Sequence, residues 1–176
     1  MKRADSTEGF SGFRLGWVFF ILGYFVSPFA MADPVFEKRI QVKAPAEAVW
    51  KAIVEPAQVE KYHFVPLRKI DLKAGGAIEY GTPEKIMISG KIVAIEPHRK
   101  LSHTFRFLGH ENTDGDSETT VTYTLAPGTD GGTELTLIHS GFSEKNQTYE
   151  NVTGGWPFLL DGLAAVAEGR DPGQKQ

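Results

Sequence analysis

Residues 135–142 read LTLIHSGF and residues 151–168 read NVTGGWPFLLDGLAAVAE, with a polar loop between them. The first segment begins by alternating apolar and polar side chains, as a half-buried strand does. The second repeats apolar residues at the three- and four-residue spacing of one helix face. Because a long helix follows a strand, this order predicts a helix that covers a sheet, with a pocket between the two layers.

The predicted helix buries one stripe of side chains. Its members are Trp156, Leu159, Leu160, Leu163, Ala164 and Ala167, with Val166 at the margin. Gly154–Gly155 is a poor helix-forming pair, and Pro157 is tolerated near a helix start. We therefore expect the helix to begin near Thr153, with a longer, kinked helix from near Asn151 as the alternative. Gly169 is expected to end it.

The preceding chain reads as strands and two short helices. After a strand pattern at 36–42, Pro45 suits the first position of a helix that ends before Pro56, and a further short turn follows at 57–62. Five more strands are predicted at residues 67–72, 77–80, 86–95, 101–107 and 120–125. Their connections are too short for crossover helices, so neighbouring strands should run antiparallel. The predicted fold class is α+β, with a curved antiparallel sheet.

Composition excludes several classes of function. The chain has 176 residues and a formal net charge of -3, without a Lys/Arg run, which argues against a protein that binds nucleic acid by neutralising phosphates. It contains no cysteine, so disulfides, thiolate nucleophiles and Cys-ligated zinc are excluded. We predict no catalytic residue, no metal ligand and no cofactor.

The N-terminal extension is predicted to be separate from the fold. Positive charges precede an apolar run at residues 15–26, and Ala30-Met31-Ala32 supplies the small residues of a signal-peptidase site. The expected organisation is a signal peptide or hydrophobic extension at 1–32, one domain at 33–169 and a polar tail at 170–176. Export is the leading expectation. The alternatives are a membrane anchor formed by residues 15–27, if they are uncleaved, and a cytoplasmic protein that starts at Met31.

Several motifs together carry a family resemblance. They are APAEAVWKA at 44–52, YHF at 62–64, GKI at 90–92, the segment 97–104, LIHSGF at 137–142 and the segment 155–163. In this order they resemble the bacterial domains similar to the C-terminal domain of the Hsp90 ATPase activator Aha1, within the START-like (SRPBCC, Bet v 1-like) superfamily. The resemblance implies a helix-grip fold: six or seven antiparallel strands curled around a long C-terminal helix, two short helices after the first strand, and an apolar cavity.

Two histidines are predicted to point where apolar side chains point. His103 shares a strand face with Leu101 and Phe105, and His139 shares one with Leu137. Each is either a core histidine with a hydrogen-bonding neighbour or a group that orients a ligand. The candidate ligand-pocket residues are Tyr80, His103, Phe105, Tyr123, His139, Trp156 and Leu160.

Three functions fit these features. The leading one is a non-enzymatic module that binds a lipid-like or aromatic small molecule in an apolar cavity under the C-terminal helix. The first alternative is an Hsp90-type cochaperone, which would have a chaperone or another protein as its partner. The second is an enzyme of the polyketide cyclase or hydrolase type, for which only His103 and His139 are candidate acids or bases.

Overall fold

The computed structural model describes residues 33–108 and 118–173, and these residues form one α+β unit. The predicted signal peptide or anchor at 1–32 lies outside the described residues, as does the end of the polar tail. The elements in chain order are β1 (Phe36–Val42), α1 (Ala46–Val54), α2 (Pro56–Tyr62), β2 (Leu67–Ile70), β3 (Ala77–Gly81), β4 (Ile86–Glu96), β5 (Lys100–Phe107), β6 (Thr119–Pro127), a 3-10 turn (Thr129–Gly131), β7 (Thr133–Ser140) and α3 (Gln147–Ala167).

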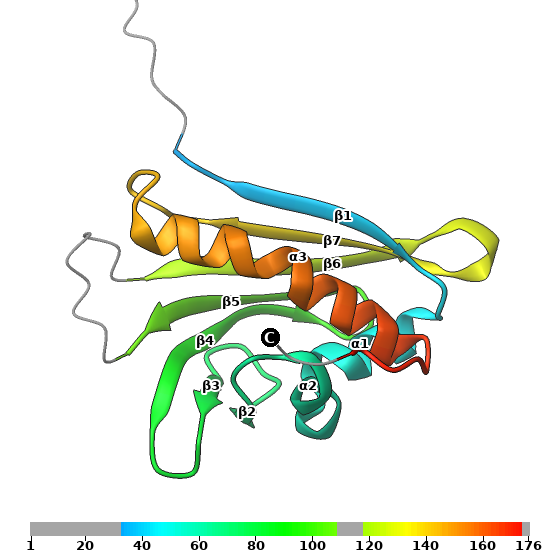
Figure 1. Ribbon diagram of the computed structural model, residues 1–176, viewed down its shortest axis with the longest axis horizontal. Helices are drawn as coiled ribbons and strands as arrows, with labels where there is room; N and C mark the ends of the chain where they lie inside the picture. The colour runs from blue at the N-terminus through cyan, green and yellow to red at the C-terminus, as the bar shows by residue number, and fades with distance from the viewer. Residues whose placement is uncertain (1–32, 109–117, 174–176) are drawn as a thin grey trace, which may run out of the picture. The chain divides into compact units, whose positions relative to one another are not determined.

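The strands form one antiparallel sheet in the order β1-β7-β6-β5-β4-β3-β2. Figure 1 shows α3 lying across one face of the curved sheet, with α1 and α2 beyond its C-terminal half. This arrangement confirms the helix-grip fold, with two short helices after the first strand and a long helix at the end. The first strand pairs with the last, so β1 and β2 are the two edges of the sheet.

The helix α3 begins earlier than we expected. It starts at Gln147, and the side chain of Asn146 caps it by accepting a hydrogen bond from the Tyr149 N–H at 3.0 Å. The predicted start near Thr153 is wrong, and the alternative near Asn151 is closer. An asparagine cap stabilises a helix start, and burial of Val152 on the sheet side offsets the poor helix propensity of the glycines that follow.

Pro157 is therefore an interior helix residue. Having no N–H, it cannot donate the usual hydrogen bond to the carbonyl four residues earlier. The large apolar residues on either side of this point, Val152, Trp156 and Leu160, are all buried. Their burial, at about 1.5 to 3 kcal/mol for a large apolar side chain, is enough to hold the helix together through the proline.

The buried stripe of α3 widens toward its C-terminus. Trp156, Leu160, Leu163 and Ala164 are buried as predicted, while Leu159 and Ala167 are only partly buried. Gly162 is buried as well, because α2 packs against α3 at this point. A Cβ atom built on Gly162 would lie 2.7 Å from Cβ of Tyr62, closer than two carbon atoms can approach. The glycine thus sets the spacing of the two helices.

Two glycines of α3 should respond in opposite directions to alanine. Gly162→Ala should destabilise the fold by about 1 to 3 kcal/mol, because the added methyl group overpacks the contact with Tyr62. Gly154→Ala should stabilise it by up to about 1 kcal/mol, because no atom lies within 4 Å of the added methyl and alanine is the better helix former. Urea unfolding of both variants measures the difference. Equal effects at the two positions would contradict the close contact of α2 and α3.

Candidate functional site

The seven predicted pocket residues all lie in the core. Five of them lie on strands of the sheet and two, Trp156 and Leu160, on α3, and each of the seven is at most 7% exposed. His103 on β5 faces Ile92 on β4 and Val121 on β6, and Val121 in turn faces His139 on β7. Directly opposed residues in antiparallel strands share a face, so both imidazoles lie on one face of the sheet.

His139 has hydrogen-bond partners on both ring nitrogens. Its Nδ1 accepts from the indole Nε1–H of Trp156 at 3.0 Å, which leaves the ring proton on Nε2. That N–H donates to Oγ1 of Thr119 at 2.7 Å, and the Thr119 hydroxyl donates to the Phe105 carbonyl at 3.1 Å. One tautomer satisfies the whole chain. His139 is a core histidine that ties α3 to β7, β6 and β5.

Among the residues that the structure describes, His103 has a hydrogen-bond partner on only one of its two ring nitrogens. Its Nδ1 lies 2.8 Å from the carbonyl oxygen of Thr104, and because a carbonyl can only accept, Nδ1 carries the proton. Nε2 therefore presents a lone pair, and no hydrogen-bond partner for this buried atom exists in the part of the chain that the structure describes. Burial lowers the pKa of His103 to about 4, so the ring is neutral near pH 7.

Two histidine–tyrosine ring pairs occur among the described residues, one of them at His103. The Tyr123 ring stacks on His103 with centroids 6.3 Å apart, and the ring of His63 stacks on Tyr80 at 4.8 Å. Burial raises the pKa of Tyr80, and burial followed by the charges of Tyr80 and Tyr62 raises the pKa of Tyr123. Both phenols stay protonated at any physiological pH, and their hydroxyls can donate or accept.

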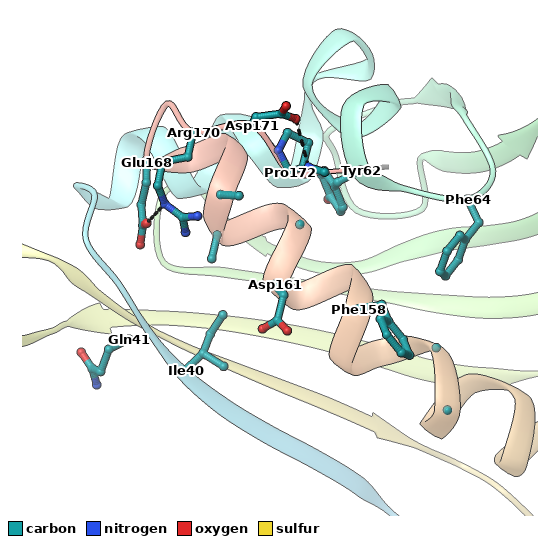
Figure 2. A pocket seen from close by; sticks show the side chains of 16 residues that line it. Ile40, Gln41, Tyr62, Phe64, Phe158, Asp161, Glu168, Arg170, Asp171 and Pro172 are labelled. Atoms are coloured by element: carbon teal, nitrogen blue, oxygen red, sulfur yellow. Dashed lines mark hydrogen bonds and ion pairs between the residues drawn. The ribbon is translucent and has the colours of Figure 1, made fainter. Parts of the chain in front are cut away.

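A groove of about 920 Å³ runs beside α3 (Figure 2). It is lined by residues of α3 between Gly154 and Ala165, by Ile40 and Gln41 of β1, by Tyr62 at the end of α2 and Phe64 after it, and by Glu168 and the segment 170–173. Figure 2 shows Phe158 extending from α3 and Phe64 from the segment after α2. None of the seven predicted pocket residues lines this groove.

The sequence analysis did not predict the groove, although the position of Phe158 indicated it. Phe158 lies outside the predicted apolar stripe of the helix, so its aromatic side chain is expected to face outward. In the structure it is 64% exposed. Phe64 is 45% exposed. Tyr62 connects the groove with the interior, since it lines the groove and belongs to the same buried core as Tyr80. Its own hydroxyl donates to the carbonyl of Ala52 at 3.0 Å.

Two other kinds of site find no support in residues 33–108 and 118–173. No group of three or more His, Asp or Glu side chains in these ranges could hold a metal ion. No helix in them is long and apolar enough to cross a membrane.

Residues 43–168 match the family described as Activator of Hsp90 ATPase homolog 1-like protein. The match covers most of the helix-grip unit, from the end of β1 to the end of α3. The chain belongs to this family. A search of curated protein sequences found no match.

Solved structures agree with the assignment. MLL2253 from Mesorhizobium loti is 26% identical, with 78% of this chain and 99% of that chain covered and a TM-score of 0.65. CalU16 from Micromonospora echinospora is 28% identical, with 76% and 75% covered and a TM-score of 0.61. PFC0360w, an HSP90 activator from Plasmodium falciparum, is 20% identical, with 75% and 94% covered and a TM-score of 0.61, and shows the fold alone. Family and fold together support a domain that binds a ligand or a protein partner.

Removing the Trp156 donor should lower stability by breaking the series of hydrogen bonds that runs through His139. In Trp156→Phe a smaller aromatic ring remains and Nδ1 of His139 loses its partner, and a buried acceptor without a partner costs about 1 to 3 kcal/mol of unfolding free energy, to which the lost ring volume adds. Phe158→Leu on the same helix is the control, and should change stability by less than about 0.5 kcal/mol. Urea unfolding measures both. A Trp156→Phe variant as stable as the wild type would show that the hydrogen bond adds nothing.

Stability should fall as the solution becomes more acidic. Burial lowers the pKa of His103 to about 4 and that of His139 to about 3, with a smaller contribution to the latter from His103. Between pH 6.5 and 5 the unfolded histidines bind protons and the folded ones do not, so the unfolding free energy drops by up to about 1.4 kcal/mol per pH unit for each. Urea unfolding at steps of pH checks this.

The variant His103→Phe provides the control for this titration. It removes one of the two depressed histidines and should reduce the slope between pH 6.5 and 5 by about half. The stability of the wild type should not depend on these two groups above pH 7.5, where they are neutral in both states. A wild-type stability that is flat from pH 6.5 to 5 would contradict burial of the two neutral rings.

Proposed function

We propose that this domain binds a lipid-like or aromatic small molecule beneath α3, without catalysing a reaction on it, and that His103 receives the polar end of that molecule. The observation that carries the proposal is the buried Nε2 of His103, an acceptor with no hydrogen-bond partner among the described residues. Buried polar groups in proteins nearly always have a partner, and the exceptions need an explanation. A bound ligand is that explanation here.

The contrast with His139 strengthens this proposal. Both imidazoles lie on the same face of the sheet, with Val121 of the intervening strand β6 between them. The fold supplies every partner for His139 and leaves one nitrogen of His103 unmatched. An unmatched buried acceptor costs about 1 to 3 kcal/mol, a cost that a ligand donor would remove. The surroundings of His103 are aromatic and aliphatic, as in most small-molecule sites.

The groove beside α3 supports access to this region. Its volume of about 920 Å³ lies within the range of about 300 to 1,000 Å³ that is usual for ligand sites. Its lining includes Tyr62, whose side chain belongs to the same buried core as Tyr80 and Tyr123. Tyr62 thus joins the groove to the core that contains Tyr123, the ring stacked on His103. We infer that the ligand enters along the groove.

A cochaperone role is the second candidate, and the exposed aromatic side chains favour it. Phe64 and Phe158 are 45% and 64% exposed and both line the groove. One structural relative is described as an HSP90 activator. An enzymatic role has less support, because both nitrogens of His139 are already engaged and only one nitrogen of His103 is available.

Binding of N-phenyl-1-naphthylamine tests the leading proposal. The dye is neutral and aromatic and should bind the full chain saturably, with increased fluorescence. Val121→Ile adds one methylene between His103 and His139 and should weaken binding at least about tenfold, by filling the space that the dye needs. Val49→Ile adds the same group to the buried face of α1 and should leave binding within about twofold.

The same titration separates the two candidates. Equal effects of Val121→Ile and Val49→Ile would contradict a site beneath α3. Loss of binding in Phe158→Ala with no effect of Val121→Ile would place the dye in the groove. If the domain is a cochaperone, it should stimulate the ATPase of an Hsp90-type chaperone, and replacement of both Phe64 and Phe158 by alanine should abolish that stimulation. Native mass spectrometry of freshly purified protein adds a direct search for a bound molecule.

A further inference from the structure

We propose that the ligand presents a neutral hydrogen-bond donor, a hydroxyl or N–H group on an aromatic body, to Nε2 of His103, and that carboxylate ligands are rejected. This inference rests on the proposed function and adds the chemical class of the ligand. Phenols, alcohols and amides belong to the accepted class, and ionised fatty acids do not. Three features of the described residues lead to this selectivity.

The first feature is the fixed tautomer of His103. The carbonyl of Thr104 holds the ring proton on Nδ1, at a distance of 2.8 Å. A neutral imidazole carries one proton, so Nε2 has only a lone pair and can only accept. A ligand group that also only accepts, such as an ether or a carboxylate, would bring two lone pairs together. A hydroxyl or N–H group completes the hydrogen bond instead.

The second feature is the absence of buried charge in the described part of the chain. The buried polar residues there are Ser102, His103, Thr119, Thr133, His139 and Thr148. None of them is a lysine or arginine that could pair with an anion, and burial keeps His103 itself neutral. An ionised carboxylate transferred into these surroundings would lose its hydration without gaining a counter-ion, which is strongly unfavourable.

The third feature is the shape of the aromatic surroundings. The Tyr123 ring lies nearly parallel to His103, with an interplanar angle of 26° and centroids 6.3 Å apart. Trp156 meets the Tyr123 ring edge-on at 6.2 Å. An aromatic ligand that packs beside these rings gains stacked and edge-on contacts of the same kind. A phenol or an aromatic amine thus combines a ring that fits the aromatic surroundings with a hydrogen-bond donor for Nε2 of His103.

Three naphthalene derivatives of one size test the inference on the full chain. 2-Naphthol carries a neutral donor, 2-methoxynaphthalene carries none, and 2-naphthoate is an anion at pH 7.5. Isothermal titration calorimetry should show 2-naphthol binding about tenfold or more tightly than either of the others, the ratio expected for one hydrogen bond of ordinary strength. In His103→Phe, which keeps a ring but removes the acceptor, the ratio of 2-naphthol to 2-methoxynaphthalene should fall to about one.

The control is the same substitution at His63. Nδ1 of His63 already accepts from the Val65 N–H at 3.1 Å, so His63→Phe removes no acceptor that a ligand would use, and the preference should persist. NMR of the wild type gives a readout that needs no variant: the Nε2 resonance of His103 should shift with 2-naphthol and not with 2-methoxynaphthalene.

The results distinguish the two levels of the proposal. Equal binding of the three probes, tightest binding of 2-naphthoate, an unchanged preference in His103→Phe, or an unmoved Nε2 resonance would overturn the donor selectivity and leave a binding domain in place. Failure of all three probes to bind the wild type would overturn the proposed function and this inference with it.

Discussion

The hydrogen bond from the indole of Trp156 to Nδ1 of His139 connects the long helix with strand β7 of the sheet. It continues through Nε2 of His139 to the hydroxyl of Thr119 and ends on the carbonyl of Phe105, so four elements, α3, β7, β6 and β5, share one chain of donors and acceptors. Buried polar groups of this kind are stabilising only when each is satisfied, and here one tautomer satisfies them all. The position of α3 on the sheet depends on this match, because a helix shifted along its axis would leave the indole donor and the imidazole acceptor both without partners.

The comparison with His139 shows what is unusual about His103. The two rings sit on one sheet face in the same apolar surroundings, yet the fold completes the hydrogen bonding of one and not of the other. Protein interiors tolerate few such exceptions, and those that occur tend to mark sites of function. The neutral state and fixed tautomer of His103 follow from burial and from the Thr104 carbonyl, and they determine what chemistry the site can accept. The family assignment supplies the fold around this residue, while the selectivity comes from the residue itself.

The groove beside α3 gives the same helix a second role. Its inward side carries the core contacts of Trp156 and Leu160, and its outward side carries Phe158 and the small residues that leave space there. Gly162 joins the two roles, since it allows α2 to approach and so places Tyr62 at the boundary between groove and interior. A single helix thereby holds the sheet, sets the spacing of α2 and forms one wall of the groove.

The amino-acid sequence by itself determined the order of the elements, the antiparallel class and the apolar faces, because alternation and helical spacing depend only on neighbouring residues. It also placed both histidines on the apolar face. The local sequence pattern gave the wrong start for α3. The glycine pair at 154–155 suggested a start near Thr153, whereas the Asn146 cap and the burial of Val152 allow the helix to begin at Gln147. Only the tertiary structure decided which histidine is structural, since the partners of His139 lie 17 and 20 residues away in the chain. Periodicity tells which way a side chain points, whereas hydrogen-bond satisfaction depends on atoms that the fold brings together.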